Sequence, residues 1–154
     1  MSAYLLAYTI IHAKNSVDQL NTLAYEDSLT KIRNRLALYH DFQSVVIENK
    51  PCVLYFLDLD RLKNINDSHG HLIGDQYIIA FTRAVQNCIT ENMEFYRISG
   101  DEFVIVDYVS DINHLLTIED IQSSIEKCFK FAIEFQGVSI GKSVFPHETD
   151  NLDS

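Results

Sequence analysis

The chain has 154 residues, of which 47% are hydrophobic and 22% are charged, with five Gly and two Pro. This composition is typical of one globular domain with a single core, and it excludes a disordered or fibrous protein. The formal net charge of −10 argues against a nucleic acid partner, because such partners favour clustered Lys and Arg. A small anionic ligand would need a local positive charge in order to bind, such as that of a metal ion.

The chain begins with a segment whose apolar residues recur at spacings of three and four, which predicts a helix over about residues 4–24. The stripe consists of Leu6, Ile10, Ala13, Val17, Leu20 and Ala24. Two interpretations are open: the helix packs back on the following domain, or it pairs with a second copy as a coiled linker. We therefore assign residues 1–25 to an N-terminal helical linker and residues 26–154 to the main domain.

No targeting segment is evident, because residues 2–13 lack a basic region and are too short to span a bilayer. Membrane attachment is expected only through segments that are not in this chain. Cys52, Cys88 and Cys128 lie far apart in apolar stretches, which predicts free thiols in a reducing, cytoplasmic compartment.

The next predicted elements are a helix and a buried strand. Residues 27–30 offer capping chemistry for a helix whose apolar face consists of Leu36, Leu38, Tyr39, Phe42, Val45, Val46 and Ile47. After Pro51, the continuous apolar run 52–57 predicts a central strand that is buried on both faces. A polar stretch follows over 61–74, and the pattern from Asp75 to about Ile89 is helical.

The second half of the chain predicts a hairpin, a helix and two further strands. The β-prone runs 95–98 and 103–108 are separated by Ser99-Gly100-Asp101-Glu102, which is typical of a four-residue turn. A helix is expected over about 118–129, and strands around 131–135 and 138–144. The order of elements favours an α+β fold with a mostly antiparallel sheet and flanking helices, in the ferredoxin-like or palm manner.

Carboxylates gather at the expected edge of this sheet. Asp58 and Asp60 follow the buried strand, and Asp101 and Glu102 lie on the turn of the hairpin. Such carboxylates repel one another unless a cation is present, and ligation by oxygen with room for phosphates suits Mg²⁺. Gly100 would let the turn backbone approach those phosphates.

A glycine-bearing segment between these carboxylates carries groups suited to a purine. Asn66 can donate and accept hydrogen bonds, while Asp75 can accept from the N1–H and amino group of guanine. The alternative is that both residues only cap helices and close turns. His69 and His71 are expected to pack in the loop rather than to bind zinc.

Four ordered motifs resemble the GGDEF family of diguanylate cyclases. Residues 27–35 are similar to DxLTGLxNR, residues 58–67 to DxDxFKxxND, and residues 97–103 to RYGGDEF, here with the signature turn Ser99-Gly100-Asp101-Glu102-Phe103. The run Val138-Ser139-Ile140-Gly141 matches the late strand of the family. The resemblance covers about residues 27–146.

This resemblance implies a nucleotidyl cyclase that condenses two GTP molecules to cyclic di-GMP. It implies that Asp58, the Leu59 carbonyl and Asp101 bind Mg²⁺ or Mn²⁺, with Glu102 as a second catalytic acid. Guanine recognition would fall to Asn66, Asp75 and His71, and the phosphates to Gly100 and the backbone around Arg61, Leu62 and Lys63. Catalysis in the family requires two GTP-loaded domains that face each other, hence a homodimer.

Three departures from the family pattern suggest further expectations. Ser99 replaces a glycine but is small enough to permit activity. The place of the product-binding RxxD motif contains Thr90-Glu91-Asn92-Met93, so product inhibition through that site should be absent. The usual C-terminal helix, whose Lys and Arg hold the triphosphate, is missing after Pro146. Two alternatives to an active cyclase are therefore open: a GTP-binding regulatory module without turnover, and a purely structural dimerisation unit. A sensor or EAL-type domain beyond the ends of this chain is an expected further partner.

Overall fold

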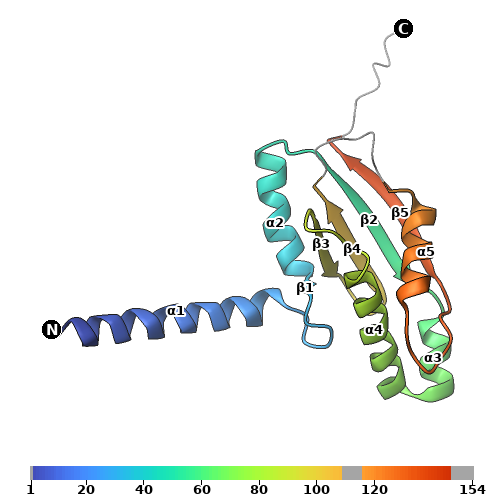
Figure 1. The fold of residues 1–154 in the computed structure, drawn as a ribbon, viewed down its shortest axis with the longest axis horizontal. Coiled ribbons are helices and arrows are strands. Elements are labelled where there is room, and N and C mark those ends of the chain that lie inside the picture. Colours follow the sequence, from blue (N-terminus) through green and yellow to red (C-terminus); the bar gives the residue numbers. More distant parts are fainter. Residues whose placement is uncertain (1, 109–115, 147–154) are drawn as a thin grey trace, which may run out of the picture.

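The computed structural model describes residues 2–108 and 116–146, which form an α+β fold built on one five-stranded sheet (Figure 1). The strand order is β1-β3-β4-β2-β5, and only the short β1–β3 pair is parallel. The strands are β1 (Arg33–Asn34), β2 (Cys52–Leu59), β3 (Met93–Arg97), β4 (Glu102–Asp107) and β5 (Val138–Phe145). The helices are α1 (Ala3–Tyr25), α2 (Arg35–Ile47), α3 (Leu62–His69), α4 (His71–Gln86) and α5 (Ile118–Cys128).

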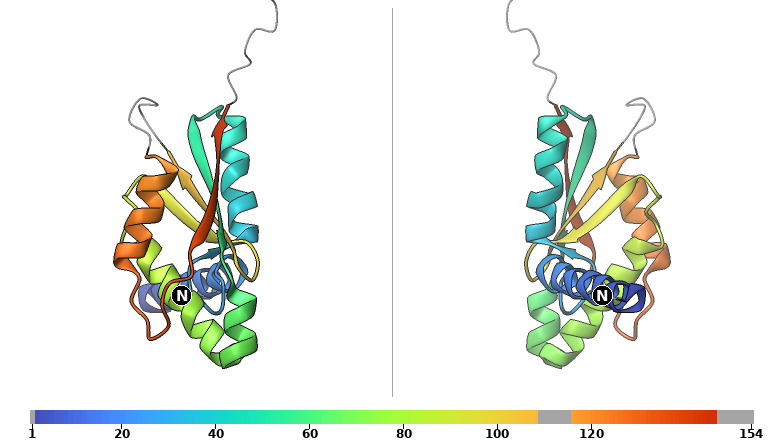
Figure 2. Two further views of the ribbon diagram at one scale, coloured as in Figure 1. Left: turned by 90° about the vertical axis from the view of Figure 1, so that its right-hand side faces the viewer. Right: turned by 90° about the vertical axis from the view of Figure 1, so that its left-hand side faces the viewer.

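The sheet lies between two unequal helical layers. Figure 2 shows α2 on one face and α4 with α5 on the other. The larger core lies under α4 and α5, where Tyr55, Leu57, Tyr77, Phe81 and Phe103 are buried. A smaller core under α2 contains Ala37, Val45, Cys52, Tyr96, Val104 and Val106. The expected fold class is confirmed.

The α2 layer leaves part of its sheet face open. Strand β2 lies in the sheet interior, as predicted, but Phe56 on the α2 side is 49% exposed. The prediction that this strand is buried on both faces is therefore wrong at that position. The apolar face predicted for α2 is also only partly buried, since Leu36, Tyr39, Val46 and Ile47 are exposed.

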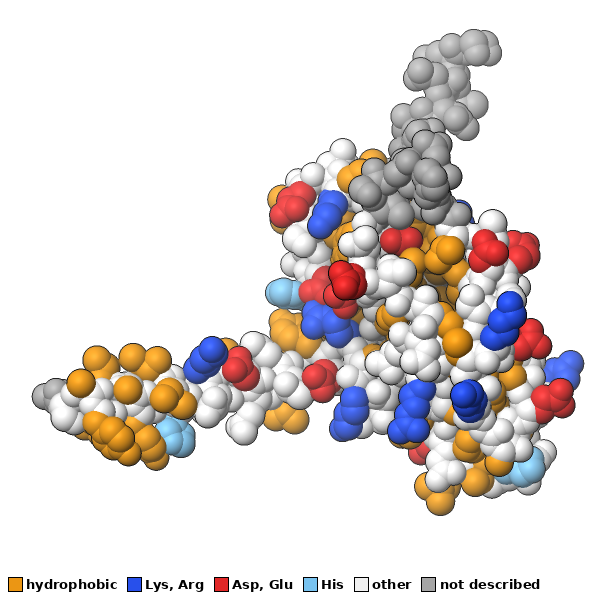
Figure 3. Space-filling view, in the orientation of Figure 1, with side chains coloured by type: hydrophobic (Ala, Val, Ile, Leu, Met, Phe, Trp, Pro, Cys, Tyr) orange, Lys and Arg blue, Asp and Glu red, His pale blue; other side chains and the backbone are white. Residues whose placement is uncertain are grey.

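The predicted N-terminal helix is present as α1, which projects away from the sheet (Figure 1). None of its residues is buried, and it meets the domain at its last turn, where Tyr25 packs against the smaller core and the ring of His40. Its N-terminal half carries exposed apolar side chains, which Figure 3 shows as a cluster. No helix in the described ranges is both long enough and apolar enough to cross a membrane.

Four local predictions differ from the structure. The polar stretch after β2 contains a helix, α3, and α4 begins at His71 rather than at Asp75. Residues 131–135 form a loop instead of a strand. Asp27 does not cap α2; it closes a turn by accepting hydrogen bonds from Thr30 N and Oγ1 at 2.8 and 2.7 Å. The N-cap of α2 is Asn34, whose side chain accepts from Ala37 N. The polar tail, 147–154, lies outside the described residues.

Candidate functional site

The end of β2 and the signature turn are joined directly. The Leu59 amide donates a hydrogen bond of 2.9 Å to the Asp101 carbonyl oxygen. In the antiparallel register of β2 and β4, Asp58 lies opposite Glu102. The structure therefore brings Asp58, Leu59, Asp101 and Glu102 to one edge of the sheet, as the sequence predicts.

These carboxylates form a concentration of negative charge. The pKa of Asp58 is raised above its ordinary value by partial burial, and then by the charges of Asp101, Glu102 and Asp60. Among the described ion pairs, none involves Asp58, Asp101 or Glu102. The donor set is all oxygen, and no described ion pair neutralises it, which fits a hard divalent ion. In the described part of the chain, no three such side chains converge closely enough to hold an ion alone.

Asp60 is held by contacts with the start of β5. Its Oδ1 accepts a hydrogen bond of 2.8 Å from Ser139 Oγ, and its amide donates to the Gly137 carbonyl oxygen at 3.1 Å. Gly137 adopts φ +107°, and a Cβ there would come within 2.9 Å of Asp60 Oδ2. Asp60 thus anchors the start of β5, so the structure separates its role from that of Asp58.

The residues assigned to guanine lie on the α3–α4 pair. The Asn66 side chain packs against the Cα of Gly74, so that any Cβ at position 74 would overlap Asn66 Oδ1. Gly70, at φ +87°, lets α4 start directly after α3. His71 and Asp75 are exposed on the first turns of α4. Only Asn66 of this set is positioned by close packing.

The residues assigned to the phosphates lie at the start of α3. Arg61 adopts the left-handed conformation, φ 58° and ψ 21°, which turns the chain from β2 into α3. No side chain caps this end, so the first amides, which include those of Leu62 and Lys63, are free to bind an anion. Leu62 is buried and anchors the turn, while Lys63 is exposed.

The signature turn is held by an arginine that the sequence analysis did not assign. Arg97 donates hydrogen bonds to Asp27 Oδ1 at 3.0 Å and to the Gly100 carbonyl oxygen at 2.8 Å. A Cβ at Gly100 would meet open space, so the free protein itself does not require glycine there. Ser99 Oγ donates to Glu102 Oε2 at 2.6 Å.

A cavity of about 370 Å³ lies beside these groups on the α2 face of the sheet. We call it the Asp58 cavity; it is lined by Asp58 and Glu102 and by the apolar or aromatic side chains Leu38, Tyr39, Phe56 and Ile98, with Arg35. The sequence analysis did not assign these flanking residues to a site; it named Leu38 and Tyr39 only as part of the apolar face predicted for α2. None of Asn66, Asp75, His71, Leu62 and Lys63 lines this cavity.

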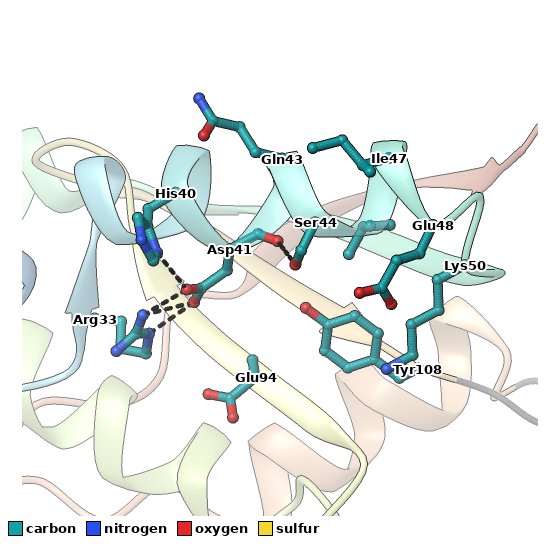
Figure 4. Close-up of a pocket in the computed structure, with 11 residues that line it drawn as sticks. Arg33, His40, Asp41, Gln43, Ser44, Ile47, Glu48, Lys50, Glu94 and Tyr108 are labelled. Atoms are coloured by element: carbon teal, nitrogen blue, oxygen red, sulfur yellow. Dashed lines mark hydrogen bonds and ion pairs between the residues drawn. The ribbon is translucent and has the colours of Figure 1, made fainter.

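A larger pocket, of about 630 Å³, lies between α2 and the free edge of β3 and contains none of the assigned residues (Figure 4). Its lining includes Asp41, which accepts hydrogen bonds from Arg33 at 2.6 to 3.0 Å and from Tyr96 Oη at 2.8 Å. The pocket carries both signs of charge, with Lys50 and Glu94 on its walls, so it offers no single ligand chemistry. Two of the assigned carboxylates, Asp58 and Glu102, line the smaller Asp58 cavity instead.

Comparison with known proteins gives one consistent family. Residues 24–154 match the GGDEF family, described as "Diguanylate cyclase, GGDEF domain". The chain is 30% identical over 142 residues to diguanylate cyclase DgcM of Escherichia coli, a match that covers 88% of this chain and 34% of that protein. It is 31% identical over 99 residues to the cyclic di-GMP phosphodiesterase PdeR of Escherichia coli, covering 63% of this chain and 15% of PdeR. The chain thus spans about a third or less of these relatives.

Solved structures agree in fold. The S helix-GGDEF-EAL portion of LapD from Vibrio cholerae, bound to c-di-GMP, superposes with a TM-score of 0.72 at 22% identity, over 86% of this chain and 32% of that one. The coiled coil and GGDEF domain of DgcB from Caulobacter crescentus, in complex with c-di-GMP, superposes with a TM-score of 0.68 at 19% identity, over 92% and 80% of the two chains.

Proposed function

Because this chain belongs to the GGDEF family of diguanylate cyclases, we propose that it binds GTP with Mg²⁺ and joins two GTP molecules into cyclic di-GMP. The observation that carries this proposal is that Asp58, Asp101 and Glu102 lie at one edge of the sheet. No ion pair among the described residues neutralises them. A bound cation would relieve their repulsion, and phosphate oxygens would complete its coordination.

Each residue would have a separate task. Asp58, the Leu59 carbonyl and Asp101 would hold the cation, which neutralises the triphosphate and acidifies the attacking 3′-hydroxyl. Mn²⁺ would suit the same oxygen ligands. The free amides at the start of α3 would bind the terminal phosphates, and the open space beside Gly100 would admit the nucleotide.

Guanine would be recognised on the α3–α4 pair. Asp75 would accept from the N1–H and amino group, with Asn66 and His71 beside it. The contact between Asn66 and Gly74 supports this role, because it fixes one of the polar groups before the base arrives. Adenine lacks the donor pattern that Asp75 would accept.

A second copy of the chain would complete the reaction. Each 3′-hydroxyl would attack the α-phosphate of the GTP in the facing domain and release pyrophosphate. The exposed stripe on α1 supports pairing of two copies, because its 3–4 spacing is that of a coiled-coil seam and no residue of α1 is buried.

The test is cyclic di-GMP formation from GTP and Mg²⁺, followed by chromatography. The chain, and a form lengthened at its C-terminus by any further residues that its gene encodes, should yield product and pyrophosphate, while Asp101→Ala should yield none. Glu126→Ala is a matched control, since Glu126 is exposed on α5 and belongs to none of the motifs. Full product from Asp101→Ala would refute the role of the signature turn.

A second candidate is a regulatory module that binds GTP without turnover. The similarity to PdeR, which is named a phosphodiesterase, supports it, because the matched region there belongs to a protein named for a different activity. This candidate predicts Mg²⁺-dependent GTP binding by calorimetry with no product in either length of chain. A chain that binds no nucleotide in either length would instead favour a structural dimerisation unit.

A further inference from the structure

Ser99 begins the signature turn, and its side chain contacts one of the acidic groups of the proposed site. Its hydroxyl donates a hydrogen bond of 2.6 Å to Glu102 Oε2. Within the described residues, no other group donates to that carboxylate. The backbones of Ser99 and Glu102 also pair, with N···O distances of 3.4 Å in both directions. The hydroxyl therefore adds a third and shorter contact across the base of the turn.

The position of Glu102 makes this contact consequential. Glu102 lies opposite Asp58 across β2 and β4, and both carboxylates line the Asp58 cavity. Like charges opposite each other in a strand pair repel, so a free Glu102 side chain would swing away from Asp58. A hydroxyl donor offsets part of the Glu102 charge and selects one orientation of its carboxylate.

We infer that Ser99 is a positioning residue that holds the Glu102 carboxylate at the Asp58 cavity, in the orientation in which it faces a divalent cation. This inference rests on the proposed function, since it requires metal–nucleotide binding at the signature turn. A glycine at position 99 has no donor to offer. The hydrogen bond from Ser99 to Glu102 is therefore available in this chain and is not available where glycine occupies the first position of the motif.

The experiment measures Mn²⁺ affinity by electron paramagnetic resonance in the presence of 3′-deoxy-GTP, which lacks the attacking hydroxyl. Ser99→Ala should weaken Mn²⁺ binding about fivefold, the effect of losing one ordinary hydrogen bond. Ser99→Gly should weaken it at least as much, and Ser99→Thr, which keeps the hydroxyl, should restore it. In a Glu102→Ala background, Ser99→Ala should have no further effect.

Ser44→Ala is the matched control, because its exposed hydroxyl also donates a short hydrogen bond, of 2.8 Å to the Asp41 carbonyl oxygen, and Ser44 does not line the Asp58 cavity. It should leave Mn²⁺ affinity unchanged. The inference is overturned if Ser99→Ala binds Mn²⁺ like the wild type, or if its effect persists in full without Glu102. Thermal melting of each variant separates a loss of folding from a loss of affinity.

Failure of the inference and failure of the proposed function are distinguishable. If the wild type binds Mn²⁺ with the analogue but makes no cyclic di-GMP from GTP, the cyclase reaction is refuted, and the effect of Ser99→Ala on affinity still decides the inference. If the wild type makes product and Ser99→Ala has unchanged metal dependence, only the inference is refuted. If the wild type does not bind the metal and analogue at all, both are refuted.

Discussion

Arg97 donates a hydrogen bond of 3.0 Å to the carboxylate of Asp27, and so ties the residues that follow α1 to the strand that leads into the signature turn. The pair is largely buried, with side-chain exposures of 11% for Arg97 and 22% for Asp27. A second nitrogen of the same guanidinium binds the Gly100 carbonyl oxygen at 2.8 Å. One side chain therefore spans two parts of the molecule.

We predict that Arg97→Lys lowers both stability and cyclase activity. A lysine amine is a point charge and does not reproduce the two separate contacts of the guanidinium. The loss of one hydrogen bond to a charged group should cost about 1.5–3 kcal/mol of the free energy of unfolding, measured by urea denaturation. Arg83→Lys, at an exposed position on α4, should change stability little. Equal stabilities for the two variants would contradict the prediction.

Gly74→Ala should weaken GTP binding about tenfold, equivalent to the loss of about one hydrogen bond. A methyl group at position 74 overlaps Asn66 Oδ1, so the Asn66 side chain must move. Alanine otherwise favours a helix by about 1 kcal/mol over glycine, so helix propensity alone would predict a more stable variant. Calorimetry with GTP and with ATP measures the change and the expected loss of discrimination.

Gly141→Ala on β5 is the control for that substitution, because a Cβ there would meet nothing within 4 Å. It should leave GTP binding unchanged. If Gly74→Ala also binds GTP normally, Asn66 does not contribute to guanine recognition from the position described.

The Asp41 network should produce a pH-dependent contribution to stability. Burial alone would raise the pKa of Asp41, but hydrogen bonds from Tyr96, His40 and Arg33, with the charge of Arg33, hold it below the ordinary 3.8. In the window between the folded pKa and 3.8 the unfolded chain binds more protons, so stability rises with pH there and is lost as pH falls through it.

Asp41→Asn should therefore cost about 1–3 kcal/mol at pH 7, from the loss of a charged acceptor, and progressively less in acid below pH 3.8. Denaturant titrations from pH 7 to pH 2 measure the difference between variant and wild type. Asp18→Asn, on exposed α1 and without a described hydrogen bond, is the control. A difference for Asp41→Asn that stays constant with pH would contradict this account.

Pairing through α1 should depend on its seam. A charge in a coiled-coil interface has no partner, so Ile10→Glu with Val17→Glu should convert a dimer into monomers and abolish cyclic di-GMP synthesis. Asn15 lies on the opposite side of the helix, and Asn15→Glu should change neither property. Analytical ultracentrifugation measures the oligomeric state of each variant. Dimers that persist in the double variant would place the interface elsewhere.

Elements with strong local signals were predictable from the sequence. The hairpin, the α1 stripe and the start of α5 are confirmed, and Thr117 and Asp120 form a reciprocal capping box there. The placement of Asp58, Asp101 and Glu102 at one edge was also predictable, because strand ends and a turn next to them share that edge.

Other elements were not predictable, because they are short or because their conformation depends on contacts with distant parts of the chain. Helix α3 has only two turns, with Leu62 and Ile65 as its buried residues, and its Asn, Asp and Ser content is typical of loops. Residues 131–135 alternate like a strand, but they do not join the sheet, in which β5 is the edge strand beside β2. Their apolar side chains instead pack on the core as a loop, with Phe135 stacked on Phe81.

The side chain of Asn34 serves two helices at once. It accepts from the Ala37 amide as the N-cap of α2, and its Nδ2 donates to the Ala24 carbonyl oxygen at 2.8 Å, in the last turn of α1. A helix of the length of α1 is about 34 Å long, so a change of about 10° at this joint would carry its far end roughly 6 Å. The Asn34 hydrogen bonds lie close to the point about which α1 would turn, so a small shift there corresponds to a large displacement at the far end of the helix. A partner that bound the N-terminal end of α1 would act on the start of α2, where Arg35, Leu38 and Tyr39 line the Asp58 cavity, through the Asn34 side chain and the Tyr25–His40 contact.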